Sequence, residues 1–182
     1  THSGLRPFRD LRALDALAPE ACSPALALAV LSDGGEADLD DMADHLRLSN
    51  AERKRMKAAR SASDIACGWG EARPAPVSDT EIRRLLFLAG REAAIDGLLH
   101  AWANAGTGPE DPVFLPALER LREAEVPVFP VTGKDLLAAG VPAGPGIGEA
   151  LARAQAAWID SGFSLDRAAL VAVATGAAGS RR

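Results

Sequence analysis

The chain has 182 residues and a formal net charge of −5. This length suffices for one large domain or two small domains with a real hydrophobic core. The acidic balance argues against an autonomous binder of long polyanions, because such proteins usually carry a basic excess. It allows a basic face on a domain that works beside a more basic one.

The composition favours helices. Only 4% of residues are aromatic, and alanine and leucine are abundant. We expect an all-α fold, an irregular multi-helix bundle with a helix-hairpin-helix-like C-terminal segment. No apolar run is long enough to cross a bilayer and no signal-peptide pattern opens the chain. We therefore expect no membrane partner and a cytoplasmic location, where Cys22 and Cys67 would be small core thiols.

Four helices are predicted in the N-terminal part of the chain. Leucines indicate a short helix over residues 11–17, and an apolar helix follows over residues 23–31. A short acidic helix is expected over residues 38–46. The capping box Ser49-Asn50-Ala51-Glu52 then begins a helix that carries the densest basic stretch of the chain.

The basic stretch of this helix allows two interpretations. Its side chains would follow a phosphate backbone, or they would form a solvated helix face paired in part with Glu52. The residues concerned are Arg53, Lys54, Arg55, Lys57 and Arg60. The carboxylates just before it, from Asp38 to Asp44, would suit a divalent cation. We prefer the simpler interpretation that the helix dipole favours acidic residues at a helix start.

Proline is frequent in residues 72–77, which we expect to be a linker or an exposed loop. This segment divides the chain into an N-terminal helical subdomain over residues 1–72 and a C-terminal helical subdomain over residues 78–175. A frayed tail is expected over residues 176–182.

The C-terminal part begins with a second capping box, Ser78-Asp79-Thr80-Glu81. Apolar residues at helical spacing follow as far as Trp102, and Gly90 either separates two helices or lies within one. A further helix is expected over residues 115–121. A last apolar helix should run from a Ser164 cap to about residue 174.

The most informative stretch covers residues 131–149, which is typical of a short helix, a glycine hairpin and the start of a second helix. Gly140 suits the left-handed residue just past the first helix, and Pro145 suits the first turn of the second. The amides of residues 146–148 are expected to lack an intrahelical acceptor, and such a helix start attracts phosphate. Lys134 lies one short helix away. The alternative is that glycine and proline only permit a tight corner.

Motifs for catalysis do not stand out. The chain has no nucleophile elbow, Walker A sequence, H-E-x-x-H motif or Rossmann glycine pattern. His100 lies on an amphipathic helix, where we expect a packing or surface residue rather than a catalytic one. Arg91 is expected to be a surface charge more readily than a contact. We assign no catalytic residue, no metal ligand and no cofactor to this chain.

Several segments together resemble one family. The C-terminal signature of bacterial tRNA nucleotidyltransferases, the CCA-adding enzymes and their poly(A) polymerase relatives, is similar to Thr132-Gly133-Lys134-Asp135-Leu136, Gly140 and Gly144-Pro145-Gly146-Ile147-Gly148-Glu149. Segments of the helical body of these enzymes resemble residues 46–53, 83–86 and 90–94. The resemblance covers most of the chain from about Ala25 to Phe163.

The resemblance implies that the chain is the body-and-tail region of such a transferase. In that family the body and tail hold tRNA, by phosphate and shape contacts to the acceptor and TΨC arm. The family's catalytic head, with its Gly-Ser and paired aspartates and its use of Mg and CTP or ATP, has no counterpart here. The chain itself is therefore expected to be non-catalytic and to work with a head domain of the same polypeptide.

For the contact with tRNA, two groups of residues are candidates. The hairpin supplies Lys134, Gly144, Gly146 and Gly148, and the basic helix supplies Arg53, Arg55 and Lys57. Two other functions stay open. One is a helix-hairpin-helix module that binds DNA, which would use the same amide geometry. The other is an interaction domain whose helices bury a partner protein.

Overall fold

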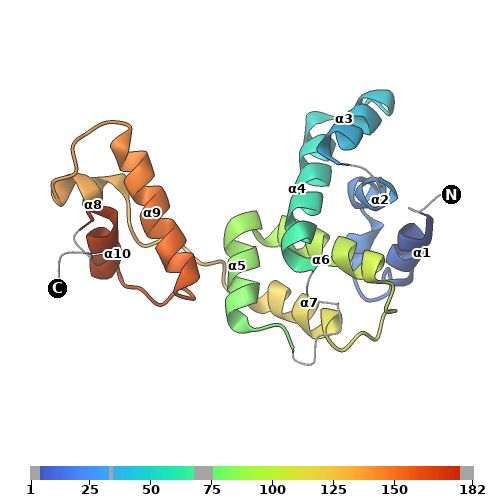
Figure 1. The fold of residues 1–182 in the computed structure, drawn as a ribbon. Helices are drawn as coiled ribbons and strands as arrows, with labels where there is room; N and C mark the ends of the chain where they lie inside the picture. The colour runs from blue at the N-terminus through green and yellow to red at the C-terminus, as the bar shows by residue number, and fades with distance from the viewer. Residues whose placement is uncertain (1–4, 33–34, 68–75, 177–182) are drawn as a thin grey trace. The chain divides into compact units, whose positions relative to one another are not determined.

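The computed structural model describes residues 5–32, 35–67 and 76–176, and these form helices and no strand (Figure 1). The predicted all-α class is confirmed. The chain divides into two compact units, Thr1–Val126 (unit 1) and Pro127–Arg182 (unit 2). The elements of unit 1 are α1 (Leu5–Ala13), the 3-10 helix η1 (Pro19–Cys22), α2 (Pro24–Leu31), α3 (Glu36–His45), α4 (Asn50–Ala66), α5 (Asp79–Ala89), α6 (Arg91–Ala105) and α7 (Phe114–Glu123). Those of unit 2 are α8 (Gly133–Ala138), α9 (Gly146–Asp160) and α10 (Arg167–Ala174). Within the described ranges, no helix combines the length and apolar character that crossing a membrane requires.

The division between the units follows Val126, whereas the sequence placed it in the Pro-rich segment. Helices α4 and α6, on either side of that segment, pack against each other within unit 1. Because these two helices pack together, the Pro-rich segment does not separate two units, and the predicted subdomains 1–72 and 78–175 differ from the two units of the chain. Of the predicted linker only Pro76 and Val77 are described, and Val77 is buried in the core. The predicted tail lies outside the described residues from position 177 onward.

Helices α4 and α6 form the frame of unit 1. Most of α6 is buried, and Gly97 lets α4 approach it closely. A Cβ atom at position 97 would lie 2.4 Å from the Cβ of Ala62 and 2.6 Å from the carbonyl carbon of the same residue. These distances are far shorter than van der Waals contact, so any side chain at position 97 would push the two helices apart.

A buried polar network crosses this frame at His100. Its Nε2–H donates to the carbonyl oxygen of Ala29 (3.3 Å), while its Nδ1 accepts from the hydroxyl of Ser63 (2.8 Å) and from the amide of Asn104 (3.1 Å). Burial lowers the pKa of His100 to about 4, so the imidazole is neutral near pH 7. His100 thus joins α2, α4 and α6, which confirms the packing position expected for it.

Gly90 ends α5 and precedes α6, so the apolar stretch forms two helices. Its φ of 75° is a conformation that glycine adopts without steric cost. Arg91 then donates to three backbone carbonyl oxygens at the end of α7, those of Leu121, Arg122 and Ala124. A guanidinium at this place satisfies carbonyls that lack intrahelical donors. Arg91 is half-buried and stabilises the end of α7, a role that the sequence did not predict.

In unit 2, α9 packs against α10 and α8, and an aromatic cluster forms around Trp158 near the end of α9. The ring of Trp158 lies 5.4 Å from that of Phe129 and 4.9 Å from that of Phe163, the latter in edge-to-face geometry. Arg167 forms an ion pair with Asp135, which links the start of α10 to α8.

Three local predictions have definite outcomes. The capping boxes at Ser49 and Ser78 are both confirmed. The last helix is capped by Asp166 and not by Ser164, because the Asp166 carboxylate accepts from the amide of Ala169 (2.8 Å). The prediction of core thiols was wrong, since both cysteines are exposed. Alanine fills the neighbouring core positions instead, at positions 21 and 66.

Candidate nucleic-acid interface

The hairpin between α8 and α9 lies on the surface of unit 2. Leu136 is buried beneath it, and the carbonyl oxygen of this residue accepts from the amide of Val141 (2.9 Å). Gly140 has a φ of 89°, so the left-handed residue expected past the first helix is confirmed. Gly144 has a φ of 147°, which a residue with a side chain would adopt only under strain.

The two helices of this hairpin begin in different ways. At α8, the Asp135 carboxylate accepts from the amide of Thr132 (2.8 Å) and from its hydroxyl (2.9 Å). This bond to the backbone of Thr132 is the main reason why the pKa of Asp135 lies below its usual range. At α9, the preceding residue is Pro145, which has no side-chain cap to offer. The chain therefore closes the first helix start itself and leaves the second uncapped.

The amides at the start of α9 only partly match the prediction. Those of Ile147 and Gly148 donate to carbonyl oxygens three residues back, on Gly144 (3.2 Å) and Pro145 (3.0 Å). These acceptors lie just before α9, so the amides have no acceptor within the helix, but two of the three are already engaged in 3-10 bonds and are not free for a phosphate. The amide of Gly146 makes no such bond within the described part of the chain.

The surroundings of the hairpin are open. Lys134 is exposed and makes no hydrogen bond or ion pair with any described residue. A Cβ atom built at Gly144, Gly146 or Gly148 would meet nothing within 4 Å. Packing therefore does not require glycine at positions 146 and 148, which lie in an ordinary helical conformation. Their lack of side chains instead leaves the backbone of α9 accessible to a ligand.

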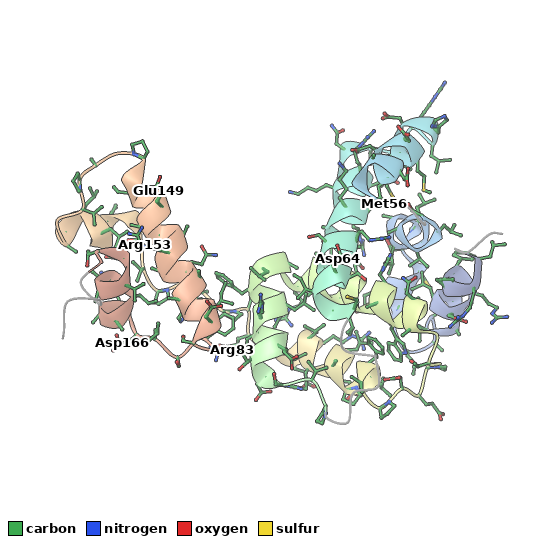
Figure 2. The ribbon with its side chains drawn as sticks, viewed as in Figure 1. Met56, Asp64, Arg83, Glu149, Arg153 and Asp166 are labelled. Carbon is green, nitrogen blue, oxygen red and sulfur yellow. The ribbon has the colours of Figure 1, made fainter. Side chains whose placement is uncertain are left out.

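A hollow of about 370 Å³ adjoins the hairpin within unit 2. One face of α9 lines it with Gly146, Ala150 and Arg153, and Thr175 contributes from beyond α10. Arg153 extends from α9 and donates to the carbonyl oxygen of Ala174 (2.7 Å), and Figure 2 labels it one turn beyond Glu149. Arg153 was not among the residues predicted from the sequence. Its spacing of seven residues from Gly146, two turns along one helix face, is the signal that could have identified it.

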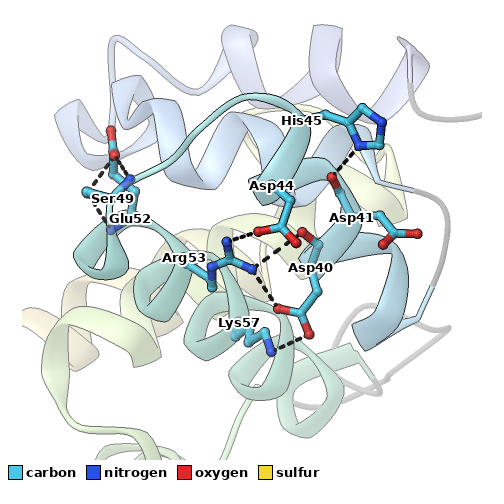
Figure 3. Close-up of polar contacts among 8 residues, drawn as sticks. All are labelled: Asp40, Asp41, Asp44, His45, Ser49, Glu52, Arg53 and Lys57. Atoms are coloured by element: carbon cyan, nitrogen blue, oxygen red, sulfur yellow. Dashed lines mark hydrogen bonds and ion pairs between the residues drawn. The ribbon is translucent and has the colours of Figure 1, made fainter.

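The basic helix α4 is arranged differently. Figure 3 shows Arg53 between two carboxylates of α3: it contacts Asp40 (3.2 Å) and forms an ion pair with Asp44. Lys57 donates to the other oxygen of Asp40 (2.8 Å). The hydrogen bond from Lys57 is the main reason why the pKa of Asp40 lies below its usual range. Asp40 and Asp44 of α3 thus balance the charges of Arg53 and Lys57 of α4.

Arg55 makes the most enclosed ion pair of the described residues. Its guanidinium donates two hydrogen bonds to Asp96, with Nε at 2.7 Å and Nη2 at 3.1 Å. The side chain of Asp96 is 1% exposed. Burial raises the pKa of Asp96, and the bonds from Arg55 counteract that rise. Arg53, Arg55 and Lys57 therefore each have a carboxylate partner within the chain, and their contact with nucleic acid stays a prediction.

The carboxylates before α4 serve the fold. Asp40 and Asp44 bind the cations of α4, and Nδ1 of His45 donates to the carbonyl oxygen of Asp41 (2.7 Å). Among the described residues, no three His, Cys, Asp or Glu side chains gather where they could hold a metal ion.

Comparisons with protein-family models, with curated proteins and with solved structures found no match for this chain. The resemblance to the tRNA nucleotidyltransferases therefore stays a prediction from the residues of the hairpin and body segments.

Proposed function

We propose that this chain is a tRNA-binding helical body and tail of a CCA-adding type of tRNA nucleotidyltransferase, and that the α8–α9 hairpin contacts the phosphate backbone. The observation that carries the proposal is the contrast between cations. Lys134, on the helix that precedes the uncapped start of α9, has no partner among the described residues, whereas the predicted contact residues of α4 are bound to carboxylates. A phosphate would therefore meet the hairpin without first displacing an acidic partner.

The chemistry of the hairpin suits an RNA backbone. The amide of Gly146, which donates to no acceptor among the described residues, offers a donor. Lys134 and Arg153 supply positive charge without a carboxylate partner in the same described ranges. The side-chain-free surface at positions 146 and 148 lets a backbone approach closely. Duplex RNA presents phosphates and 2′-hydroxyls in place of readable base edges, so contacts of this kind fit its recognition.

The distribution of charge supports the same assignment. Residues 1–126 contain 15 Lys and Arg against 21 Asp and Glu, whereas residues 127–182 contain five against four. The acidic excess of the chain thus belongs to unit 1. Unit 2 has no such excess to repel a polyanion.

The test is a salt titration of tRNA binding, measured by fluorescence anisotropy on the whole chain. We expect Lys134→Ala to weaken binding at low salt and to reduce the slope of log K against log salt by about one unit, because one phosphate contact is lost. Gly146→Ala should also weaken binding without lowering thermal stability, since the added methyl group meets open space in the protein. The matched control is Arg47→Ala, which removes another exposed cation, one from the other unit that has no partner in the described part of the chain.

Competition separates this proposal from its rivals. Transfer RNA should displace a labelled tRNA more effectively than duplex DNA of equal phosphate content. The reverse order would favour a DNA-binding hairpin. Equal salt slopes for the parent chain and Lys134→Ala would show that Lys134 does not contact a phosphate. If the chain binds neither tRNA nor duplex DNA, the proposal is refuted.

A further inference from the structure

A second hollow lies in unit 1, where the junction of α5 and α6 meets α4. Its volume is about 440 Å³. Five of the residues that line it are small, namely Ala51, Ala58, Ala89, Gly90 and Ala93. None of these has a side chain longer than a methyl group. The space therefore stays open to a ligand of several atoms.

Among the charged residues that line this hollow, cations outnumber carboxylates. Lys54, Arg55 and Arg91 line it together with one carboxylate, that of Glu92. Arg55 lies 3.1 Å from the Glu92 carboxylate, while Arg91 is bound to carbonyl oxygens that leave its net charge in place. Lys54 is exposed and has no hydrogen bond or ion pair with any described residue. Asp96 also binds Arg55, so three cations face two carboxylates and the hollow keeps a small excess of positive charge, although unit 1 as a whole is acidic.

The backbone adds to this positive field. Helix α6 has 15 residues and begins in the hollow at Arg91, and its N-cap, Gly90, supplies no side-chain cap. The amide of Ala94 donates to the carbonyl oxygen of the N-cap residue Gly90 (2.9 Å), and this bond closes the first turn of α6. The positive end of α6 thus acts in the same direction as the charges of Lys54 and Arg91.

We propose that this hollow binds a phosphate group, carried either by a polynucleotide backbone or by a free nucleotide. Lys54 is the residue that reaches the phosphate without giving up an existing contact. Arg91 stays in its structural position and adds charge, Arg55 stays bound to Asp96 and Glu92, and the α6 amides donate to the phosphate oxygens. The site belongs to unit 1, so it does not depend on the α8–α9 hairpin or on the function proposed for it.

The test follows backbone amide signals of the whole chain by NMR. Inorganic phosphate and adenosine 5′-monophosphate are titrated separately against sodium chloride at equal ionic strength. We expect saturable shifts at Gly90, Arg91 and Glu92 with both phosphate compounds and not with chloride. Lys54→Glu should weaken this binding about tenfold, because a charge-assisted contact becomes a repulsion. Lys54→Arg should retain the binding, and Arg47→Ala is the control that should leave it unchanged.

A titration with tRNA then identifies the source of the phosphate. If tRNA perturbs the same amides in a manner that depends on Lys54, the ligand is a polynucleotide. If only the mononucleotide does so, it is a free nucleotide. Shifts that equal those with chloride, or that persist in Lys54→Glu, would overturn the proposal. Lys134→Ala should leave the response to phosphate intact, so a failure of the hairpin as an RNA contact would be seen separately.

Discussion

Helix α4 and the α8–α9 hairpin both attract attention in the sequence as basic or anion-seeking segments, but they use charge in opposite ways. Three of the cations on α4 are bound to carboxylates from α3 and α6. The hairpin has one lysine, and it is bound to nothing among the described residues. The density of basic residues in a sequence therefore says little about binding. The decisive property is whether the same chain already supplies the counter-charge.

The sharpest test of this comparison is the pair of Arg55→Ala and Lys134→Ala. Removing Arg55 leaves the enclosed carboxylate of Asp96 without its partner, so we expect a loss of about 3 kcal/mol in the free energy of unfolding. Lys134→Ala should leave that free energy unchanged. Urea unfolding measures both, with the neighbouring variant Lys54→Ala as control. Adding Asp96→Asn to Arg55→Ala should restore part of the stability. A cost for Arg55→Ala no larger than that of Lys54→Ala would break the comparison.

The second prediction concerns the neutral core network of unit 1. The folded pKa of His100, about 4, lies below the unfolded value of 6.5, so the unfolded state binds the extra proton. The contribution of His100 is fully present above pH 6.5 and declines as the pH falls toward 4. Between pH 7 and pH 4.5 we expect a loss of about 2 kcal/mol from this residue alone.

His100→Gln is the variant that isolates this effect, because glutamine does not titrate. The difference between the parent chain and His100→Gln in unfolding free energy should shrink by that amount at pH 4.5. Arg60 and Asp64 carry charges that also act on His100, so their variants serve as controls. Parallel pH profiles for the parent chain and His100→Gln would contradict the assignment of a neutral buried ring.

The smallest expected effect comes from Arg53, whose partners are exposed. Arg53→Ala breaks two ion pairs on the surface of α3 and α4, and exposed pairs contribute little. We expect the melting temperature to fall by no more than about 2 °C. The salt slope of tRNA binding should not change. If Arg53→Ala reduced the salt slope of tRNA binding as much as Lys134→Ala does, α4 would have to be part of the tRNA contact.

The local signals of the sequence predicted the helices well. The capping boxes at Ser49 and Ser78, the apolar spacing of α6 and the glycine at position 140 each depend on neighbours within one or two turns. Such interactions join residues that are close in the sequence, and they determine where a helix begins and ends. The Ser164 prediction failed at this same level, because Asp166 offers a better acceptor two residues later.

The tertiary partners of the charged residues could not be predicted in the same way. Arg55 and Asp96 are 41 positions apart, and Arg91 reaches a helix end 30 to 33 residues away. The boundary between the units was also misplaced, because a Pro-rich segment marks a break in the chain and not a break in packing. In the hairpin, the sequence identified Lys134 but not Arg153, whose position depends on the face of α9 that lines the hollow.

The close approach of Ala62 and Gly97 has a consequence for tracing distant kin of this chain. A glycine that faces an alanine across two helices, flanked by the pairs Arg55 with Asp96 and Ser63 with His100, amounts to a spatial fingerprint. Written along the chain it is Arg-x6-Ala-Ser on one helix and Asp-Gly-x2-His on another. We expect a distant relative that keeps this contact between the two helices to keep the six-residue pattern, even where its overall sequence identity to this chain is low.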